Sequence, residues 1–112
     1  MFVQMRKITV AEGFTDQVAE RFRKPGIIEQ QEGFVDLKIL VKKARRGDEE
    51  VVILITWESE EHWKKWEKSD AHIAGHKQRR NEAKPEYILN VEVGHYEVKA
   101  VKQAAQSASA ED

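Results

Sequence analysis

The sequence predicts an α+β fold, with four strands in one sheet and helices on one of its faces. Three observations support this prediction. Some segments alternate apolar and polar residues with the two-residue period of a strand, whereas others repeat apolar residues at the spacing of a helix. These segments follow one another as strand, helix, strand, strand, helix and strand. The chain of 112 residues also has the length of a single domain.

The first strand and the first helix are predicted near the N-terminus. Residues 1–10, MFVQMRKITV, contain several β-branched residues and no glycine or proline, which favours a strand that ends before Gly13. An apolar stripe with a four-residue spacing then predicts an amphipathic helix, which ends before Pro25 and Gly26. The stripe consists of Phe14, Val18 and Phe22.

Two strands joined by a hairpin are predicted in the middle of the chain, after a short extra turn at residues 26–30. Residues 33–43 alternate apolar and polar side chains, as a half-buried strand does. Residues 51–57, VVILITW, are apolar on both faces, which is typical of a central strand. The charged segment 44–50 contains Gly47 and is the predicted hairpin tip.

A helical region in two pieces is predicted next. Ser59 is suited to cap the first piece, and Ser69 with Asp70 to cap a second piece that runs to about Arg80. The side-chain oxygen of serine or aspartate accepts a hydrogen bond from one of the first amides of a helix, which have no partner within the helix. A loop over residues 81–86 follows.

The last strand is predicted in residues 87–101. Its apolar residues change face near Gly94, which predicts a bulge or bend at that position. Residues 102–112 are mostly small and polar, so we expect a flexible C-terminal tail. The single domain would then span residues 1–101.

This element order is that of the ferredoxin-like, split βαβ plan (βαββαβ). Helices cover one face of such a sheet. The other face also needs a cover, because residues 51–57 are apolar on both sides. A second copy of the chain is the simplest cover. Two sheets packed face to face would give a symmetric homodimer, a dimeric α+β barrel.

Composition excludes several classes of function. Charged residues make up 35% of the chain but cancel to a net charge of −1, so there is no overall basic field for nucleic acid. The absence of cysteine excludes disulfides, thiolate catalysis, zinc–thiolate sites and iron–sulfur clusters. Residues 1–10 include two charges and no long apolar run, unlike a secretory signal or a membrane span. We therefore expect a cytoplasmic protein without a nucleic-acid or membrane partner.

The stretch WEKSDAHIAGH, residues 66–76, carries residue types that a surface helix does not need. His72 and His76 are four residues apart and share a helix face, a spacing that is common in metal sites. A closed zinc site needs two further ligands, and His62 and His95 are predicted on other elements. The spacing alone is therefore a weak indication of a zinc site.

The same stretch also suits a flat ligand. Ala71 and Gly75 form a strip of small residues beside His76, and Trp66 and Phe22 could supply apolar walls. One imidazole with small neighbours and aromatic walls suits haem, whose iron can take a single protein ligand. The simpler interpretation is that the histidine is packed against other side chains and that the tryptophan belongs to the core.

Several blocks of the sequence resemble the IsdG-like haem-degrading monooxygenases, a group within the antibiotic biosynthesis monooxygenase superfamily. The resemblance extends from about residue 2 to residue 99. Its most specific block is KSDAHIAGHK, which contains His76 and follows Trp66, so that the two residues stand ten apart with KSD and the A-G-H pattern between them. The other blocks are ITVAEG, ERF, EGFVDLKIL, DEEVVILITWESEEHWKKW and YEVK.

The resemblance implies a subunit that binds one haem between its helices and its sheet and that dimerises into a β-barrel. It implies that the imidazole of His76 is the axial ligand of the haem iron, and that Trp66 is a wall that forces the porphyrin out of plane. Distortion of the macrocycle is one way in which a protein tunes haem. Haem would be both substrate and cofactor, degraded with O2 and an external electron donor to free iron and a bilin-like product.

One position departs from the family pattern. Arg6 stands where the family has an asparagine that donates a hydrogen bond to the distal ligand. Arginine is longer, permanently charged and rich in donors, so it can donate to oxygen, turn to a haem propionate or extend to solvent. Gln4, on the same strand face, offers an amide in its place. In the matching ERF block, Phe22 is expected to face the haem pocket or the core, and Arg21 to lie near a propionate or at the surface.

Two other functions stay open at this point. The Arg6 departure favours a haem-binding or stress-response dimer that does not turn haem over. Other members of the superfamily suggest a cofactor-free monooxygenase that acts on a polyphenolic or quinol substrate. In that case His76 would ligate no iron.

Overall fold

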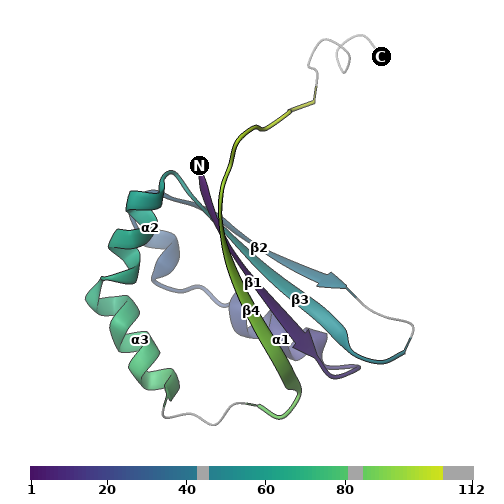
Figure 1. The fold of residues 1–112 in the computed structure, drawn as a ribbon. Coiled ribbons are helices and arrows are strands. Elements are labelled where there is room, and N and C mark those ends of the chain that lie inside the picture. The colour runs from purple at the N-terminus through teal and green to yellow at the C-terminus, as the bar shows by residue number, and fades with distance from the viewer. Residues whose placement is uncertain (43–45, 81–84, 105–112) are drawn as a thin grey trace.

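The elements follow the predicted order in the computed structural model, which describes residues 1–42, 46–80 and 85–104 (Figure 1). Its strands are β1 (Phe2–Val10), β2 (Phe34–Lys42), β3 (Glu49–Trp57) and β4 (Ile88–Glu97). Its helices are α1 (Thr15–Arg23), the short 3-10 helix η1 (Ile28–Gln30), α2 (Glu60–Glu67) and α3 (Asp70–Arg80). The predicted βαββαβ order is confirmed, and the second helical region has the two predicted pieces.

These strands form one antiparallel sheet in the order β2-β3-β1-β4, so the predicted ferredoxin-like α+β fold is confirmed. The apolar strand β3 lies between β2 and β1, as its sequence predicts. Ile8 is opposite Val51 and Arg6 is opposite Ile53. Because side chains alternate along a strand, this register decides which residues share a face.

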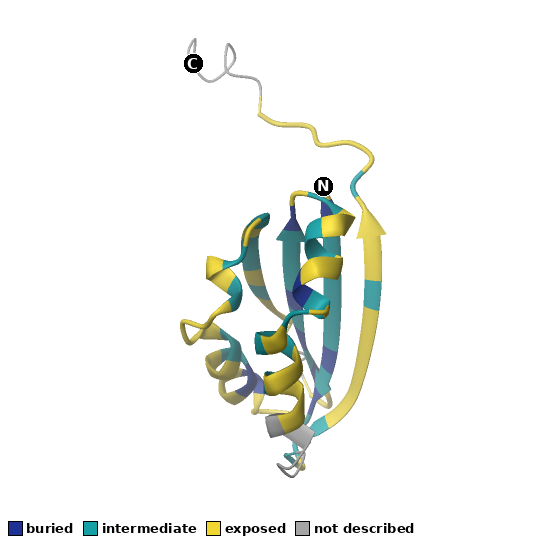
Figure 2. Cartoon of the chain, turned by 90° about the vertical axis from the view of Figure 1, so that its left-hand side faces the viewer, coloured by how far each residue is buried: buried dark blue, intermediate teal, exposed yellow. Residues whose placement is uncertain are grey.

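The helices lie on one side of the sheet, where they bury two apolar clusters (Figure 2). In the first cluster, α1 packs the fully buried Val18 among side chains of the sheet that include Val10 and Val51. In the second cluster, α2 packs Trp66 with Phe2 and Trp57. Full burial of a side chain of this kind contributes roughly 1.5–3 kcal/mol, so the clusters hold the helices firmly on this face.

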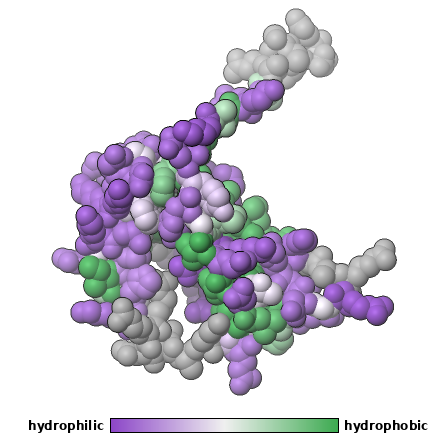
Figure 3. All heavy atoms as spheres, viewed as in Figure 1, coloured by the Kyte–Doolittle hydropathy of each residue, from purple (hydrophilic) through white to green (hydrophobic). Residues whose placement is uncertain are grey.

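The opposite face of the sheet is rich in apolar side chains, and no helix of the described residues covers it. Figure 3 shows apolar side chains gathered over the strands. Leu40 is 47% exposed and Tyr96 is 51% exposed. The apolar residues that the register assigns to this uncovered face are Val3, Met5, Leu40, Val52, Leu54 and Tyr96.

Strand β4 ends at Glu97, whereas the sequence predicts a strand that continues to residue 101. The strand is at the edge of the sheet and pairs with β1, where Glu97 is opposite Phe2. The amide of Val98 still donates to the carbonyl oxygen of Met1 at 2.8 Å. Residues 98–104 continue without helix or strand (Figure 1).

The predicted bulge near Gly94 is wrong. The register shifts instead at Leu89: Thr9 is opposite Asn90 and Val10 is opposite Ile88, so Leu89 has no opposite residue in β1. A Cβ at position 94 would lie 2.6 Å from Oη of Tyr96 and 2.9 Å from two of its ring carbons, so the half-exposed Tyr96 ring would have to shift to admit one. The apolar residues change face across Gly94 without a bulge, since Val93 lies on the helix-covered face and Tyr96 on the uncovered face.

Three predicted segments fall partly outside the described residues: 43–45 at the hairpin tip, 81–84 in the loop before β4, and 105–112 in the tail. At the tip, Gly47 has a φ of +89°, the left-handed conformation that glycine adopts readily in turns. No helix in the described part of the chain is long and apolar enough to cross a membrane.

Candidate active site

A cavity of about 520 Å³ lies between the helix-covered face of the sheet and the helices. Its volume is within the range of small-molecule sites, roughly 300–1,000 Å³. The lining residues come from all four strands, from α1, α2 and α3, and from the segment between α1 and β2, so the fold brings together positions that are far apart in the sequence. All the residues predicted to form a site line this cavity: Arg6, Arg21, Phe22, Trp66 and His76.

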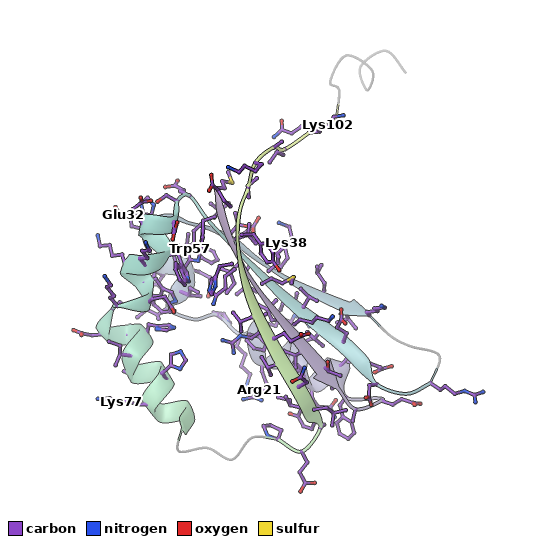
Figure 4. The ribbon with its side chains drawn as sticks, viewed as in Figure 1. Arg21, Glu32, Lys38, Trp57, Lys77 and Lys102 are labelled. Carbon is purple, nitrogen blue, oxygen red and sulfur yellow. The ribbon has the colours of Figure 1, made fainter. Side chains whose placement is uncertain are left out.

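Helix α3 forms one wall, to which it contributes Ala71, His72, Gly75 and His76. These positions recur with the helical period, so they lie on one face of the helix. Lys77 points away from the sheet (Figure 4). The small residues lie beside the histidines, as predicted, and leave room for a flat ligand near the helix backbone.

Helix α3 begins at the predicted Ser69 cap. The hydroxyl of Ser69 accepts a hydrogen bond from the amide of His72 at 3.2 Å and donates to the carbonyl oxygen of Trp66 at 2.7 Å. The cap satisfies one of the amides that a helix start leaves without a partner. A single side chain thus joins the end of α2 to the start of α3 and fixes the direction in which α3 leaves Trp66.

Trp66 lies in the last turn of α2 and is 9% exposed. It packs with Phe2 and Trp57 in the core, and it also lines the cavity. From the sequence, this indole could be either a core residue or a wall of the cavity. In the structure it is both. Because the core supports it from behind, the indole cannot easily move aside for a ligand.

His72 lies between Trp66 and His76. Its ring centroid is 5.0 Å from that of Trp66, at 67°, and 4.5 Å from that of His76, at 73°. Its Nε2 is 2.8 Å from Oε2 of Glu67, and its Nδ1 is 3.2 Å from the carbonyl oxygen of Glu67. The sequence identifies His72 only through its spacing from His76, because the Glu67 contact depends on the turn between α2 and α3.

The described residues contain no group of three or more His, Asp or Glu side chains that could hold a metal ion by themselves. Both ring nitrogens of His72 are close to oxygen atoms of Glu67. A metal at the HxxxH pair would therefore have to displace one of these oxygens from the His72 nitrogen that it binds.

The sheet forms the opposite wall of the cavity. Gln4 and Arg6 face the cavity from β1, as the strand alternation predicts. His95 of β4 is opposite Gln4 and also lines the cavity, a position that the sequence leaves unassigned. Its ring lies 4.5 Å from that of Trp63 and stacks at 6.0 Å on that of Phe2. The register of β1 against β4 is the signal that identifies it.

Charged side chains are present on the cavity wall as well. Arg21 extends from the last turn of α1, where positive charge complements the helix dipole (Figure 4). Arg6 and Lys24 also line the cavity, so the described residues place three cationic side chains there, which suit a ligand with carboxylates. Glu29, also on the wall, accepts from the amide of Gly26 at 3.0 and 3.1 Å.

Phe22 also comes from the last turns of α1. It lines the cavity and packs against the apolar cluster beneath α1. The cavity therefore has an aromatic side chain from α1 as well as the indole of Trp66 from α2. Phe22 thus lies at both of the places that the sequence offers for it, the cavity and the core.

The chain is similar to several known proteins. The family model described as antibiotic biosynthesis monooxygenase matches residues 1–78. The heme-degrading monooxygenase HmoA of Bacillus subtilis is 63% identical over 103 residues, which cover 92% of this chain and 95% of that protein.

Solved structures show the same fold. A Bacillus cereus protein described as an antibiotic biosynthesis monooxygenase has a TM-score of 0.83 and 50% identity, over 94% of this chain and 97% of its own. The heme-degrader MhuD of Mycobacterium tuberculosis, solved with two hemes bound in its active site, has a TM-score of 0.66 and 20% identity. That match covers 92% of this chain and 100% of the MhuD chain, and it shows a shared fold.

Proposed function

This chain belongs to the antibiotic biosynthesis monooxygenase family, and from that premise we propose that it is a haem-degrading monooxygenase. One observation carries the proposal: Trp66 and His76, which the sequence singles out, line the same cavity. A close relative is named for the same activity. Haem is then the substrate, and opening of its ring releases iron and a bilin-like product.

The residues of the cavity fit haem. Haem is a flat, largely apolar macrocycle with two propionate groups and an iron that takes axial ligands. The cavity offers an imidazole from His76, a strip of small residues at Ala71 and Gly75, and aromatic walls from Trp66 and Phe22. Its cations suit the propionates. When bound, haem supplies both the iron that activates O2 and the carbon framework that is oxidised.

We assign His76 the role of axial ligand. Imidazole is a common ligand of haem iron. His76 follows Gly75 on the cavity face of α3, so a ring plane can approach the helix closely. His72, one turn earlier, has both ring nitrogens next to Glu67 and is the poorer candidate.

We assign Trp66 the role of a steric wall. Its indole is supported from behind by Phe2 and Trp57, so it resists displacement by a ligand. A rigid wall beside an anchored macrocycle bends the macrocycle, and bending changes its reactivity. The bulk of the side chain matters in this role, rather than a hydrogen bond.

On the sheet side, Arg6 and Gln4 are the proposed hydrogen-bond donors to oxygen on the side of the haem away from His76. Both side chains line the cavity from β1, opposite the α3 wall. Arg21 is the proposed partner of a propionate, because its guanidinium can form two parallel bonds to a carboxylate.

The proposed reaction needs O2 and electrons from an external reductant or reductase. A monooxygenase incorporates one atom of O2 into its substrate and reduces the other atom to water, which consumes two electrons. We expect the protein to act in the cytoplasm, where cellular reductants can supply these electrons.

We also propose that the protein is a homodimer formed through the uncovered face of the sheet. That face exposes part of Leu40 and Tyr96 beside other apolar side chains on β1 and β3. An exposed apolar surface of this kind is typical of an interface. In a two-fold dimer the same surface serves both subunits, so each covers the other.

Haem titration followed by reduction tests the proposed activity. The purified protein should form a Soret band with hemin, and the band should decay when ascorbate is added in air, with release of iron. Catalase is included to remove hydrogen peroxide, which destroys haem without an enzyme. A Soret band that stays stable under these conditions would contradict haem degradation.

Arg6 favours a second candidate, a dimer that binds haem in a stress response without turning it over. The substitution Arg6→Asn restores the residue that the family has at this position. If this variant degrades haem more than about tenfold faster than the natural protein in a single turnover, the second candidate is supported. Similar rates, both well above the decay of free hemin, support the enzyme. A protein with no affinity for hemin would point to the cofactor-free monooxygenase.

A further inference from the structure

His72 contacts both residues on which the proposed reaction depends. Its ring is edge-on to the indole of Trp66 on one side and to the imidazole of His76 on the other. The three rings thus form a continuous row along the wall of the cavity. A shift of the middle ring would change the contacts of both of its neighbours.

Glu67 fixes the ring of His72 at two points. The carboxylate is 2.8 Å from Nε2, and the main-chain carbonyl oxygen is 3.2 Å from Nδ1. Both oxygens are acceptors, so a ring nitrogen that carries a hydrogen can donate to the oxygen beside it. Rotation of the ring about its Cβ–Cγ bond would break these contacts. The His72 side chain is 14% exposed and that of Glu67 is 36% exposed, so the contact is partly shielded from water.

The contact also joins two helices. Glu67 is the last residue of α2, whereas His72 lies in the first turn of α3, which begins at Asp70. Ser69 adds a second connection through its bonds to the Trp66 carbonyl and the His72 amide. Since Trp66 belongs to α2 and His76 to α3, the geometry of this turn decides how far apart the indole and the imidazole are.

We propose that Glu67 and His72 form a positioning pair that holds Trp66 and His76 at a set separation and angle, and thereby sets how strongly bound haem is bent. The inference rests on the proposed function. The imidazole of His76 anchors the macrocycle, while the indole of Trp66 limits where it can lie. A misplacement of about 1 Å can cost about 100-fold in rate, so this geometry needs support from neighbouring residues.

Three variants with one matched control test the pair. Glu67→Ala removes the carboxylate, Glu67→Gln keeps an acceptor oxygen in nearly the same place, and His72→Ala removes the ring. Glu61→Ala is the control, because Glu61 is an exposed glutamate on the same helix and does not line the cavity. Urea unfolding of all variants shows which of them remain folded.

The first readout is the resonance Raman spectrum of the ferric haem complex, in which out-of-plane modes report bending of the macrocycle. We expect these modes to weaken in Glu67→Ala and His72→Ala, to recover in part in Glu67→Gln, and to stay unchanged in the control. Hemin affinity should change by less than about tenfold, because the axial ligand is retained, whereas the decay of the Soret band should slow by about tenfold or more. Spectra identical to wild type in both alanine variants would overturn the inference.

The second readout uses the haem-free protein. NMR should show contacts between the rings of His72 and Trp66 and between those of His72 and His76, and Glu67→Ala should lose them. Contacts that persist in Glu67→Ala would overturn the positioning role. A wild-type protein that takes up no hemin would refute the proposed function instead, so the two failures are distinguished.

Discussion

His76 and Trp66 are expected to differ in what the protein loses when each side chain is shortened. His76 is exposed on the cavity face of α3. Trp66 is buried and belongs to a core cluster with Phe2 and Trp57. Shortening of His76 should therefore reduce haem binding, whereas shortening of Trp66 should reduce both the stability of the protein and haem turnover.

For His76→Ala, we expect hemin affinity to fall by at least about tenfold, which corresponds to about 1.4 kcal/mol, because the proposed bond to iron is lost. The free energy of unfolding should change by less than about 0.5 kcal/mol, as for most exposed residues. Hemin titration and urea unfolding measure the two effects. Lys77→Ala is the control, since Lys77 is adjacent and points away from the sheet. An iron–imidazole signal that survives in His76→Ala would make a different histidine the ligand.

For Trp66→Ala, we expect a loss of about 3–5 kcal/mol in stability, because a large buried aromatic side chain is removed from the core. The variant that remains folded should still bind hemin but degrade it slowly. Trp66→Phe preserves much of the bulk, so it should keep most of the activity. Urea unfolding and the decay of the Soret band check both statements. Wild-type turnover in a folded Trp66→Ala protein would exclude the proposed steric wall.

Among the elements, the turn between α2 and α3 has the greatest influence on the site. For Ser69→Ala we expect a loss of about 0.5–2 kcal/mol in stability, since a helix cap is removed. Hemin affinity should fall as well, because Ser69 also holds the carbonyl of Trp66. Urea unfolding and hemin titration measure both losses.

The matched control for this prediction is Ser59→Ala. Ser59 caps α2 by accepting from the amide of His62 at 3.2 Å, so its loss should cost a similar amount of stability. Ser59 does not line the cavity, and hemin affinity should stay unchanged. Equal losses of hemin affinity in the two variants would show that the turn has no special role.

The order and type of the elements could be predicted from sequence because they depend on local signals. Apolar periodicity identifies the strands and helices, and Ser59 and Ser69 identify the helix starts. The details of β4 depend on its partner instead. The strand ends at Glu97, opposite Phe2 at the start of β1, and its register with β1 shifts at Leu89. Neither signal is present in the sequence of β4 itself.

At the scale of the whole molecule, residues from the two ends of the chain meet in the cavity. His95 faces the cavity because it is opposite Gln4, and that pairing cannot be read from either strand alone. His72 and Glu67 are close in sequence, but their contact depends on the direction of α3. The resemblance of the sequence to a known family identifies Trp66 and His76 directly, whereas residues outside its motifs become visible only in the fold.

The uncovered sheet face leads to a prediction about assembly. Leu54→Asp places a charge in the middle of that face, on β3, and should shift the protein from dimer to monomer because burial of an unpaired charge is costly. Sedimentation velocity measures the change. Ile73→Asp is the control, since Ile73 is 43% exposed on α3 and does not line the cavity. A wild-type protein that sediments as a monomer would refute the proposed dimer.

Strand β1 contributes to two surfaces at once: Gln4 and Arg6 face the cavity, while Val3 and Met5 lie on the reverse side of the sheet. Insertion or deletion of one amino acid within this strand would exchange the two sets, since alternate side chains point in opposite directions. Descendants of this gene can therefore vary the strand by substitution but not by changing its length. Length variation should accumulate in the connecting segments instead, where an added residue alters neither surface.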